Sequence, residues 1–208
     1  MRRLKFLAQG LFALLLLAPP AAGVAQDEDD PVAWSKTAAT GALDLCRDDA
    51  PDAAAVAEHG EVWGWPHFVP YLEHPDGFQR EAGGESRRTF QAAGKSAFVE
   101  LTVQSGQVTA AAPAGLRYFR CELAADQPIA GALRAYFTAA YGPPAEDTPG
   151  AVVWLKGDAA GQAAVGAGED AAWKAAAAAS PGARLDRVEL STERGLVRAK
   201  WTVFLRSP

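Results

Sequence analysis

Cys46 and Cys121 are the only cysteines in this sequence of 208 residues. They lie 75 residues apart (121 − 46), so they do not form a Cys-x-x-Cys redox motif, and two cysteines alone do not complete a structural zinc site. In an oxidising compartment an even number of cysteines favours a disulfide, and a cross-link over a loop of this length stabilises the folded chain by roughly 4 kcal/mol. We therefore predict a structural disulfide between them, with a pair of buried free thiols as the alternative.

The N-terminus predicts export into such a compartment. The positively charged start MRRLK precedes an apolar run over residues 6–18, and the small residues Gly23 and Ala25 fit the cleavage rule of a secretory signal peptide. The alternative, an uncleaved membrane anchor, needs about 20 apolar residues, whereas this run is shorter and is followed by Pro19. We expect cleavage after Ala25, which removes residues 1–25 and leaves a periplasmic or secreted chain without a membrane span.

Cleavage also changes the charge of the chain. Removal of residues 1–25 takes away three positive charges and moves the formal net charge from −5 to −8. An acidic chain repels nucleic acids and anionic lipids, so we expect neither as a partner. The remaining 183 residues (208 − 25) are enough for one domain. We expect an acidic leader at residues 26–30 and a single domain over residues 31–208.

Helical patterns occur in three places. Asp30 is a suitable cap for a first helix that contains Pro31 in its first turn. A second, short helix is expected to end at Gly60, because glycine readily adopts the left-handed conformation at a helix C-terminus. The strongest pattern, with apolar residues at helical spacing over residues 129–140, predicts an amphipathic helix that ends at Gly142.

Alternating apolar and polar residues predict six strands, with hairpin turns at residues 105–106 and 193–195. Phe119, Cys121 and Leu123 share one face of a strand, so Cys121 is expected to point into the core. The predicted strands are residues 98–103, 107–111, 116–123, 151–155, 185–192 and 196–205.

The order of these elements predicts the fold class. Residues 157–182 are mainly Ala and Gly, and we interpret them as an insert with a short helix that docks through Trp173. Strands joined by hairpins, with few helices between them, are typical of α+β proteins. We therefore predict an antiparallel sheet of about six strands, with an N-terminal helical region and one central amphipathic helix packed on it, and one disulfide.

Part of this arrangement is shared with a known group of proteins. The residues that carry the likeness are Cys46, residues 53–60, Trp63 or Trp65, residues 121–123 and residues 129–142. This pattern resembles small, Ala-rich exported proteins with two cysteines from alphaproteobacteria, a group to which no activity is assigned. The resemblance implies a periplasmic domain and carries over no catalytic or binding residue.

The sequence contains no recognised catalytic or metal-binding motif. Nucleophile motifs of the Gly-x-Ser-x-Gly type, phosphate-binding glycine motifs and His-Glu-x-x-His are absent. His59, His67 and His74 are seven or eight residues apart, whereas ligands from one helix or turn are usually two to four residues apart. His59 also lies near the expected end of a helix, where the helix dipole favours a partly cationic ring. We therefore expect no metal ion and no cofactor.

Aromatic residues are concentrated between residues 60 and 80. Such a group either plugs one end of a sheet or forms the wall of a groove for a ring, a sugar or an extended peptide. The candidate ligand-binding residues in this segment are Trp63, Trp65, His67, Tyr71 and His74.

The leading functional hypothesis is a non-enzymatic periplasmic domain that binds a small ligand, an envelope component or another protein through the loop at residues 60–80. It depends on the predicted export, on the aromatic residues of the loop and on the lack of a catalytic motif. The alternative is a periplasmic hydrolase whose site surrounds His67.

Overall fold

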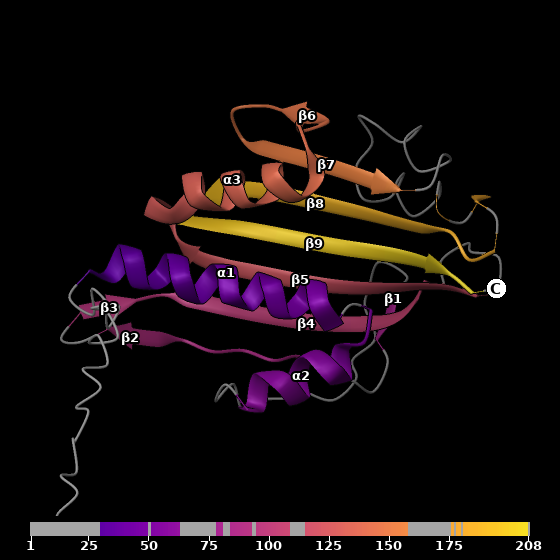
Figure 1. The fold of residues 1–208 in the computed structure, drawn as a ribbon, viewed down its shortest axis with the longest axis horizontal. Helices are drawn as coiled ribbons and strands as arrows, with labels where there is room; N and C mark the ends of the chain where they lie inside the picture. Colours follow the sequence, from indigo (N-terminus) through magenta and orange to yellow (C-terminus); the bar gives the residue numbers. More distant parts are fainter. Residues whose placement is uncertain are drawn as a thin grey trace, which may run out of the picture.

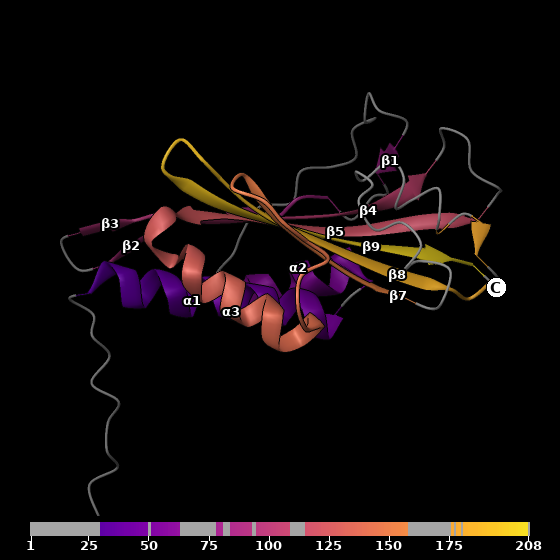
Figure 2. The same cartoon turned by 90° about the horizontal axis from the view of Figure 1, so that it is seen from above.

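A computed structural model describes residues 30–49, 51–62, 78–80, 84–92, 95–108, 115–157, 176, 178–179 and 181–207. These residues form two layers, in which three helices lie on one face of an antiparallel sheet (Figures 1 and 2). The helices are α1 (Pro31–Asp49), α2 (Ala53–Val62) and α3 (Ala130–Tyr141), and a short 3-10 helix, η1 (Gln127–Ile129), leads into α3. No helix in the described part of the chain is long and apolar enough to cross a membrane.

The main sheet has seven strands in the order β1-β4-β5-β9-β8-β7-β6, and every neighbouring pair is antiparallel. Two further strands form a separate hairpin, β2 (Phe90–Ala92) with β3 (Lys95–Ala97). The predicted α+β class and antiparallel sheet are thus confirmed, and the short edge strands β1 and β6 flank five long ones. The strands of the main sheet are β1 (Phe78–Arg80), β4 (Val99–Val108), β5 (Leu116–Asp126), β6 (Glu146–Asp147), β7 (Ala151–Gly157), β8 (Arg184–Glu193) and β9 (Leu196–Arg206).

Aspartates cap the two N-terminal helices. The Val32 N–H donates to Asp30 Oδ1 over 2.9 Å at the start of α1, as predicted. At the start of α2, Asp52 Oδ1 accepts from the N–H groups of Ala54 and Ala55 at 2.9 and 3.2 Å. In each case a carboxylate satisfies main-chain donors that have no partner within the helix.

The predicted end of α2 at Gly60 is wrong, because the helix continues to Val62. Gly60 is buried together with Ala53, Val56 and Ala57. Their successive separations of three, one and three positions place them on one helix face. Gly60 therefore belongs to the buried side of α2 and does not end the helix.

The predicted turn at residues 105–106 is also wrong. Strand β4 continues through it, with Ser105 opposite Phe119 and Gly106 opposite Tyr118 of β5. A polar Ser-Gly pair is typical of a turn, but here both residues pair with β5, and Gly106 also pairs with β1, so ladder hydrogen bonds stabilise the extended form. Of the predicted strand 107–111, the first two residues belong to β4 and the others lie outside the described residues.

The predicted hairpin at the C-terminus is confirmed. Glu193 pairs with Leu196 at the end of β8 and β9, and a two-residue turn joins them. Arg194 and Gly195 both have positive φ values, 53° and 82°. Two such residues match the twist of a tight antiparallel hairpin, and glycine adopts this conformation without a steric penalty.

One cross-strand row shows how the sheet forms the core. Opposite residues in successive strands place Val103, Cys121, Trp201, Val188 and Trp154 side by side on the face that the helices cover. All five side chains are buried. Burial of apolar surface of this kind is the main favourable contribution to folding.

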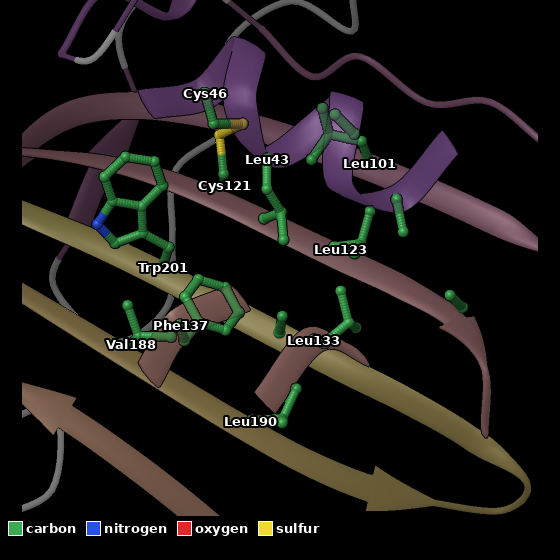
Figure 3. Close-up of a cluster of buried hydrophobic side chains, with 14 of the residues drawn as sticks. Leu43, Cys46, Leu101, Cys121, Leu123, Leu133, Phe137, Val188, Leu190 and Trp201 are labelled. Atoms are coloured by element: carbon green, nitrogen blue, oxygen red, sulfur yellow. A yellow bond between two sulfur atoms is a disulfide. The ribbon is translucent and has the colours of Figure 1, made fainter. Parts of the chain in front are cut away.

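Helices α1 and α3 cover this row, and a disulfide links one of them to it (Figure 3). Leu43 of α1 and Leu133 and Phe137 of α3 are fully buried against the sheet. Cys46 of α1 is bonded to Cys121 of β5 with a Cα–Cα distance of 6.4 Å, as predicted. Most of the predicted insert, including Trp173 and the short helix proposed around it, lies outside the described residues.

Replacement of both cysteines by alanine should lower the free energy of unfolding by roughly 4 kcal/mol, because the unfolded chain loses a cross-link that closes a loop of 75 residues. Urea titration of the wild type and of the double variant measures this difference. A reducing agent should destabilise the wild type and leave the double variant unchanged. A loss below about 1 kcal/mol would contradict the prediction.

Candidate functional site

The five side chains that the sequence proposed for ligand binding, Trp63, Trp65, His67, Tyr71 and His74, all lie outside the described residues. At the end of that segment, β1 pairs with residues 106–108 of β4 at the edge of the main sheet. The role of the loop at residues 60–80 in binding therefore stays a prediction.

His59 has a structural partner. Its Nδ1 lies 2.5 Å from Asp49 Oδ2, which connects α2 to the last residue of α1. The imidazole is largely exposed. Within the described ranges, no group of three or more His, Cys, Asp and Glu side chains is arranged to hold a metal ion.

A cavity of about 390 Å³ opens on the helix-covered face, near the C-terminal ends of α1 and α3. Small-molecule sites usually have volumes of about 300–1,000 Å³. The residues whose side chains define this cavity are Arg47 of α1, Tyr141 of α3, Lys156 of β7, Arg184 and Asp186 of β8, and Trp201 of β9. We call it the C-end cavity.

Strand alternation places these side chains beyond the core. Lys156 is directly opposite Asp186, one row further along the same face than the pair Trp154 and Val188. Two residues along a strand correspond to a rise of about 7 Å. This next row carries charged residues on β7 and β8 and the buried Val203 on β9, so Trp201 lies at the boundary between core and cavity.

Asp186 is held by two neighbours. Arg184 donates from Nε to Asp186 Oδ1 at 2.6 Å and from Nη2 to Oδ2 at 2.9 Å, and the Tyr141 hydroxyl donates to Oδ2 at 3.3 Å. Burial, and next the charge of Asp186, raise the pKa of Tyr141 well above its ordinary value, so its hydroxyl stays protonated. This group presents a neutralised carboxylate to the cavity.

The other two cations differ in their partners. Arg47 forms ion pairs with Asp44 at 2.9 Å and Asp48 at 3.1 Å. Lys156 Nζ lies 3.5 Å from the Ala140 carbonyl oxygen and 5.6 Å from the centre of the Tyr141 ring. Among the described residues no carboxylate pairs with Lys156, so it brings an uncompensated positive charge to the cavity.

Trp201 provides a buried hydrogen-bond donor. Its side chain is 3% exposed, and its indole Nε1 has no hydrogen-bond partner within the described part of the chain. Figure 3 shows this nitrogen on the side of the ring that is turned away from Leu133 and Leu190. By contrast, Trp154 Nε1 donates to the Gly142 carbonyl oxygen at 3.2 Å. An unsatisfied buried donor costs about 1–3 kcal/mol, so an acceptor at Trp201 would be favoured.

In the described part of the chain, two other cavities lack an unpartnered buried donor of this kind. One of about 560 Å³ lies beside the Arg134–Asp147 ion pair, and one of about 370 Å³ lies beside Val32 and Ser35 at the start of α1. None of the unpartnered buried polar atoms of the described chain belongs to the lining of either cavity. The C-end cavity is therefore the better candidate for a ligand.

The opposite face of the sheet carries a buried polar row. Gln104, Arg120, Thr202 and Arg187 are opposite one another on β4, β5, β9 and β8, and each is at most 5% exposed. Arg120 Nε donates to Thr202 Oγ1 at 3.2 Å. Charged side chains are rarely this buried unless they are paired. Any group that covers this face must therefore offer polar partners to the row.

Sequence reasoning missed most of the C-end cavity. Asp186 is the one residue of the cavity that the sequence could have indicated. It is a charged residue at a position where strand alternation predicts a core-facing side chain. Lys156 lies one residue beyond the predicted end of its strand. Trp201 lies within the predicted strand 196–205, and strand alternation does not reveal whether its indole N–H has a partner.

No protein-family model, curated protein or solved structure matches this chain.

Lys200, on the polar face of the sheet, should make the stability of the protein depend on pH. It lies between Glu122 and Glu189 of the neighbouring strands. Burial, and next the charge of Arg120, lower its pKa from 10.5 to about 8. Between these two values the unfolded chain binds the proton that the folded chain has lost, so stability should rise with pH from about 8 to 10, by at most about 1.4 kcal/mol per pH unit.

Urea titrations at several pH values in this window measure the slope. Lys200→Gln should remove it, whereas Lys36→Gln on the exposed side of α1 should not. Above pH 10 the unfolded tyrosines ionise while Tyr136 and Tyr141, whose pKa values are raised mainly by burial, stay protonated, so stability should fall again. A flat or falling profile between pH 8 and 10 in the wild type would contradict the prediction.

Proposed function

We propose that this chain is an exported periplasmic domain that binds a small polar ligand in the C-end cavity and catalyses no reaction. The observation that carries this proposal is the unpartnered indole N–H of Trp201 at the boundary between the core and the cavity. A donor in this position is costly in the free protein and becomes useful when a ligand supplies the acceptor.

Export is supported by two independent features. The first is the charged, apolar and small-residue pattern of residues 1–25. The second is the Cys46–Cys121 disulfide, since such bonds persist in oxidising compartments. The resemblance to exported two-cysteine proteins of alphaproteobacteria agrees with this location.

The loop at residues 60–80 gives a second binding hypothesis, in which Trp65 contacts an envelope component or another protein. The rival hypothesis is a hydrolase whose site surrounds His67. Under the rival, His67→Ala would abolish a hydrolytic activity and leave the Tm unchanged.

The binding hypothesis predicts a ligand-dependent rise in Tm. We suggest a panel of sugars, amino acids, small organic acids and their amides, tested by thermal unfolding. A ligand at 100 times its Kd stabilises the folded state by about 2.7 kcal/mol, which corresponds to roughly 5–10 °C for a domain of this size. At least one compound should produce such a rise in the wild type.

Two matched variants connect the rise in Tm to the cavity. Trp201→Phe removes the unpartnered donor and should abolish the rise. Trp154→Phe removes a donor that is already bonded to Gly142 and should retain it. Equal shifts in the two variants would place the ligand elsewhere, and no shift with any compound would count against the proposal.

Processing of the N-terminus is a separate prediction. When the full-length chain is expressed in a Gram-negative bacterium, the protein recovered from the periplasm should begin at Gln26, as measured by intact mass. Ala25→Arg should block this cleavage, because the peptidase accepts only a small residue at this position. Recovery of the wild type with Met1 intact would support the uncleaved anchor.

A further inference from the structure

We propose that the ligand of the C-end cavity is a small carboxylic acid, whose carboxylate is bound between the Lys156 ammonium group and the Trp201 indole N–H. This inference rests on the proposed binding function and names the ligand class for the same site. The hydrogen-bonding capacity, the charge and the spacing of the side chains that line the cavity favour such a ligand.

The two groups of the cavity that are still available to bind a ligand, the Trp201 indole and the Lys156 ammonium group, are hydrogen-bond donors. An indole N–H only donates, and an ammonium group offers three donors and no acceptor. Of the polar groups that could accept, Asp186 already receives two hydrogen bonds from Arg184 and one from Tyr141, which leaves it little remaining capacity. A ligand must therefore bring acceptors, and ionised acceptors form the stronger hydrogen bonds with such donors.

The charges around the cavity leave one positive charge without a partner. Arg47 is paired with Asp44 and Asp48, and Arg184 is paired with Asp186. Lys156 has only a main-chain carbonyl group and an aromatic ring beside it. One uncompensated cation matches a monoanion, and we therefore favour a carboxylate over a doubly charged phosphate.

The negative groups near the site are each neutralised. Asp186 would repel a carboxylate, but two hydrogen bonds from Arg184 and one from Tyr141 offset its charge. The C-terminal end of α3 also carries partial negative charge, and there the Ala140 carbonyl oxygen lies 3.5 Å from Lys156 Nζ. These contacts position the ammonium group for a ligand.

The spacing of the donors suits a small ligand. Strand β8 separates β7 from β9, and Lys156 lies one row further along the sheet than Trp201, so their Cα atoms are about 12 Å apart. Trp201 is buried and Lys156 is exposed, so the donors stand at the inner and the outer side of the cavity. A carboxylate between them leaves the rest of a 390 Å³ space for a compact body against the Tyr141 ring.

Matched acids and amides test this inference directly. Benzoate and benzamide, and butyrate and butyramide, have nearly the same shape within each pair and differ by one charge. We expect titration calorimetry to show that at least one acid binds the wild type, and that its amide binds at least tenfold more weakly. Added sodium chloride should weaken the binding of the acid, because an exposed ammonium group contributes to it.

Variants identify the two donors. Lys156→Gln and Trp201→Phe should each reduce the affinity for the acid at least tenfold. Lys36→Gln and Trp154→Phe are the matched controls, and they should retain wild-type affinity. Lys156 is exposed, so its replacement should leave the Tm of the free protein unchanged and thereby separate a binding role from a structural one.

The outcomes separate this inference from the proposed function. If amides bind as tightly as acids, or if Lys156→Gln has an unchanged affinity for the acid, the ligand is not recognised by its carboxylate. The proposed function of the cavity as a binding site would then still stand. Tighter binding of inorganic phosphate than of any acid would show that the cavity prefers a tetrahedral oxyanion to a carboxylate. If neither acid binds with a Kd below 10 mM, the inference fails, while the proposed function fails only if the wider panel also gives no shift.

Discussion

The disulfide between Cys46 and Cys121 is the contact on which the arrangement of the helix layer depends. Cys121 lies on β5, between β4 and β9 in the seven-stranded sheet, and the bond holds the C-terminal part of α1 at a Cα separation of 6.4 Å from it. Arg47 follows Cys46 directly and lines the C-end cavity. One covalent bond therefore contributes both to the stability of the helix layer and to the shape of the cavity.

The sheet has two chemically different faces, and the C-end cavity lies where the apolar face ends. Helices α1 and α3 cover the apolar rows, and beyond their last turns the next row carries Lys156 and Asp186. Two tryptophans of the same apolar row then differ in one respect. Trp154 has a carbonyl partner at the end of α3, whereas Trp201 has none and borders the cavity. This difference is the physical basis of the proposed binding function.

Much of the fold could be predicted because it depends on patterns within a few residues. Helix α3, the hairpin of β8 and β9 and the cap at Asp30 follow from local periodicity, turn chemistry and capping. Gly60 and the turn at residues 105–106 were predicted wrongly, because the same residues can end an element or continue it. The packing of α2 and the strand neighbours of β4 decided in favour of continuation. Alternation also did not predict that Thr202 is buried on the polar face of β9.

By itself the sequence determined the secondary-structure types, the disulfide and a hypothesis of export, because these depend on composition, spacing and local periodicity. It did not determine the candidate site. The side chains of the C-end cavity come from α1, α3, β7, β8 and β9, and strand order brings them together from positions 47 to 201. Whether Trp201 has a partner depends on which acceptors lie within about 3 Å of its nitrogen. Only the tertiary structure decides this, because hydrogen bonds form across space between residues that are distant in the chain.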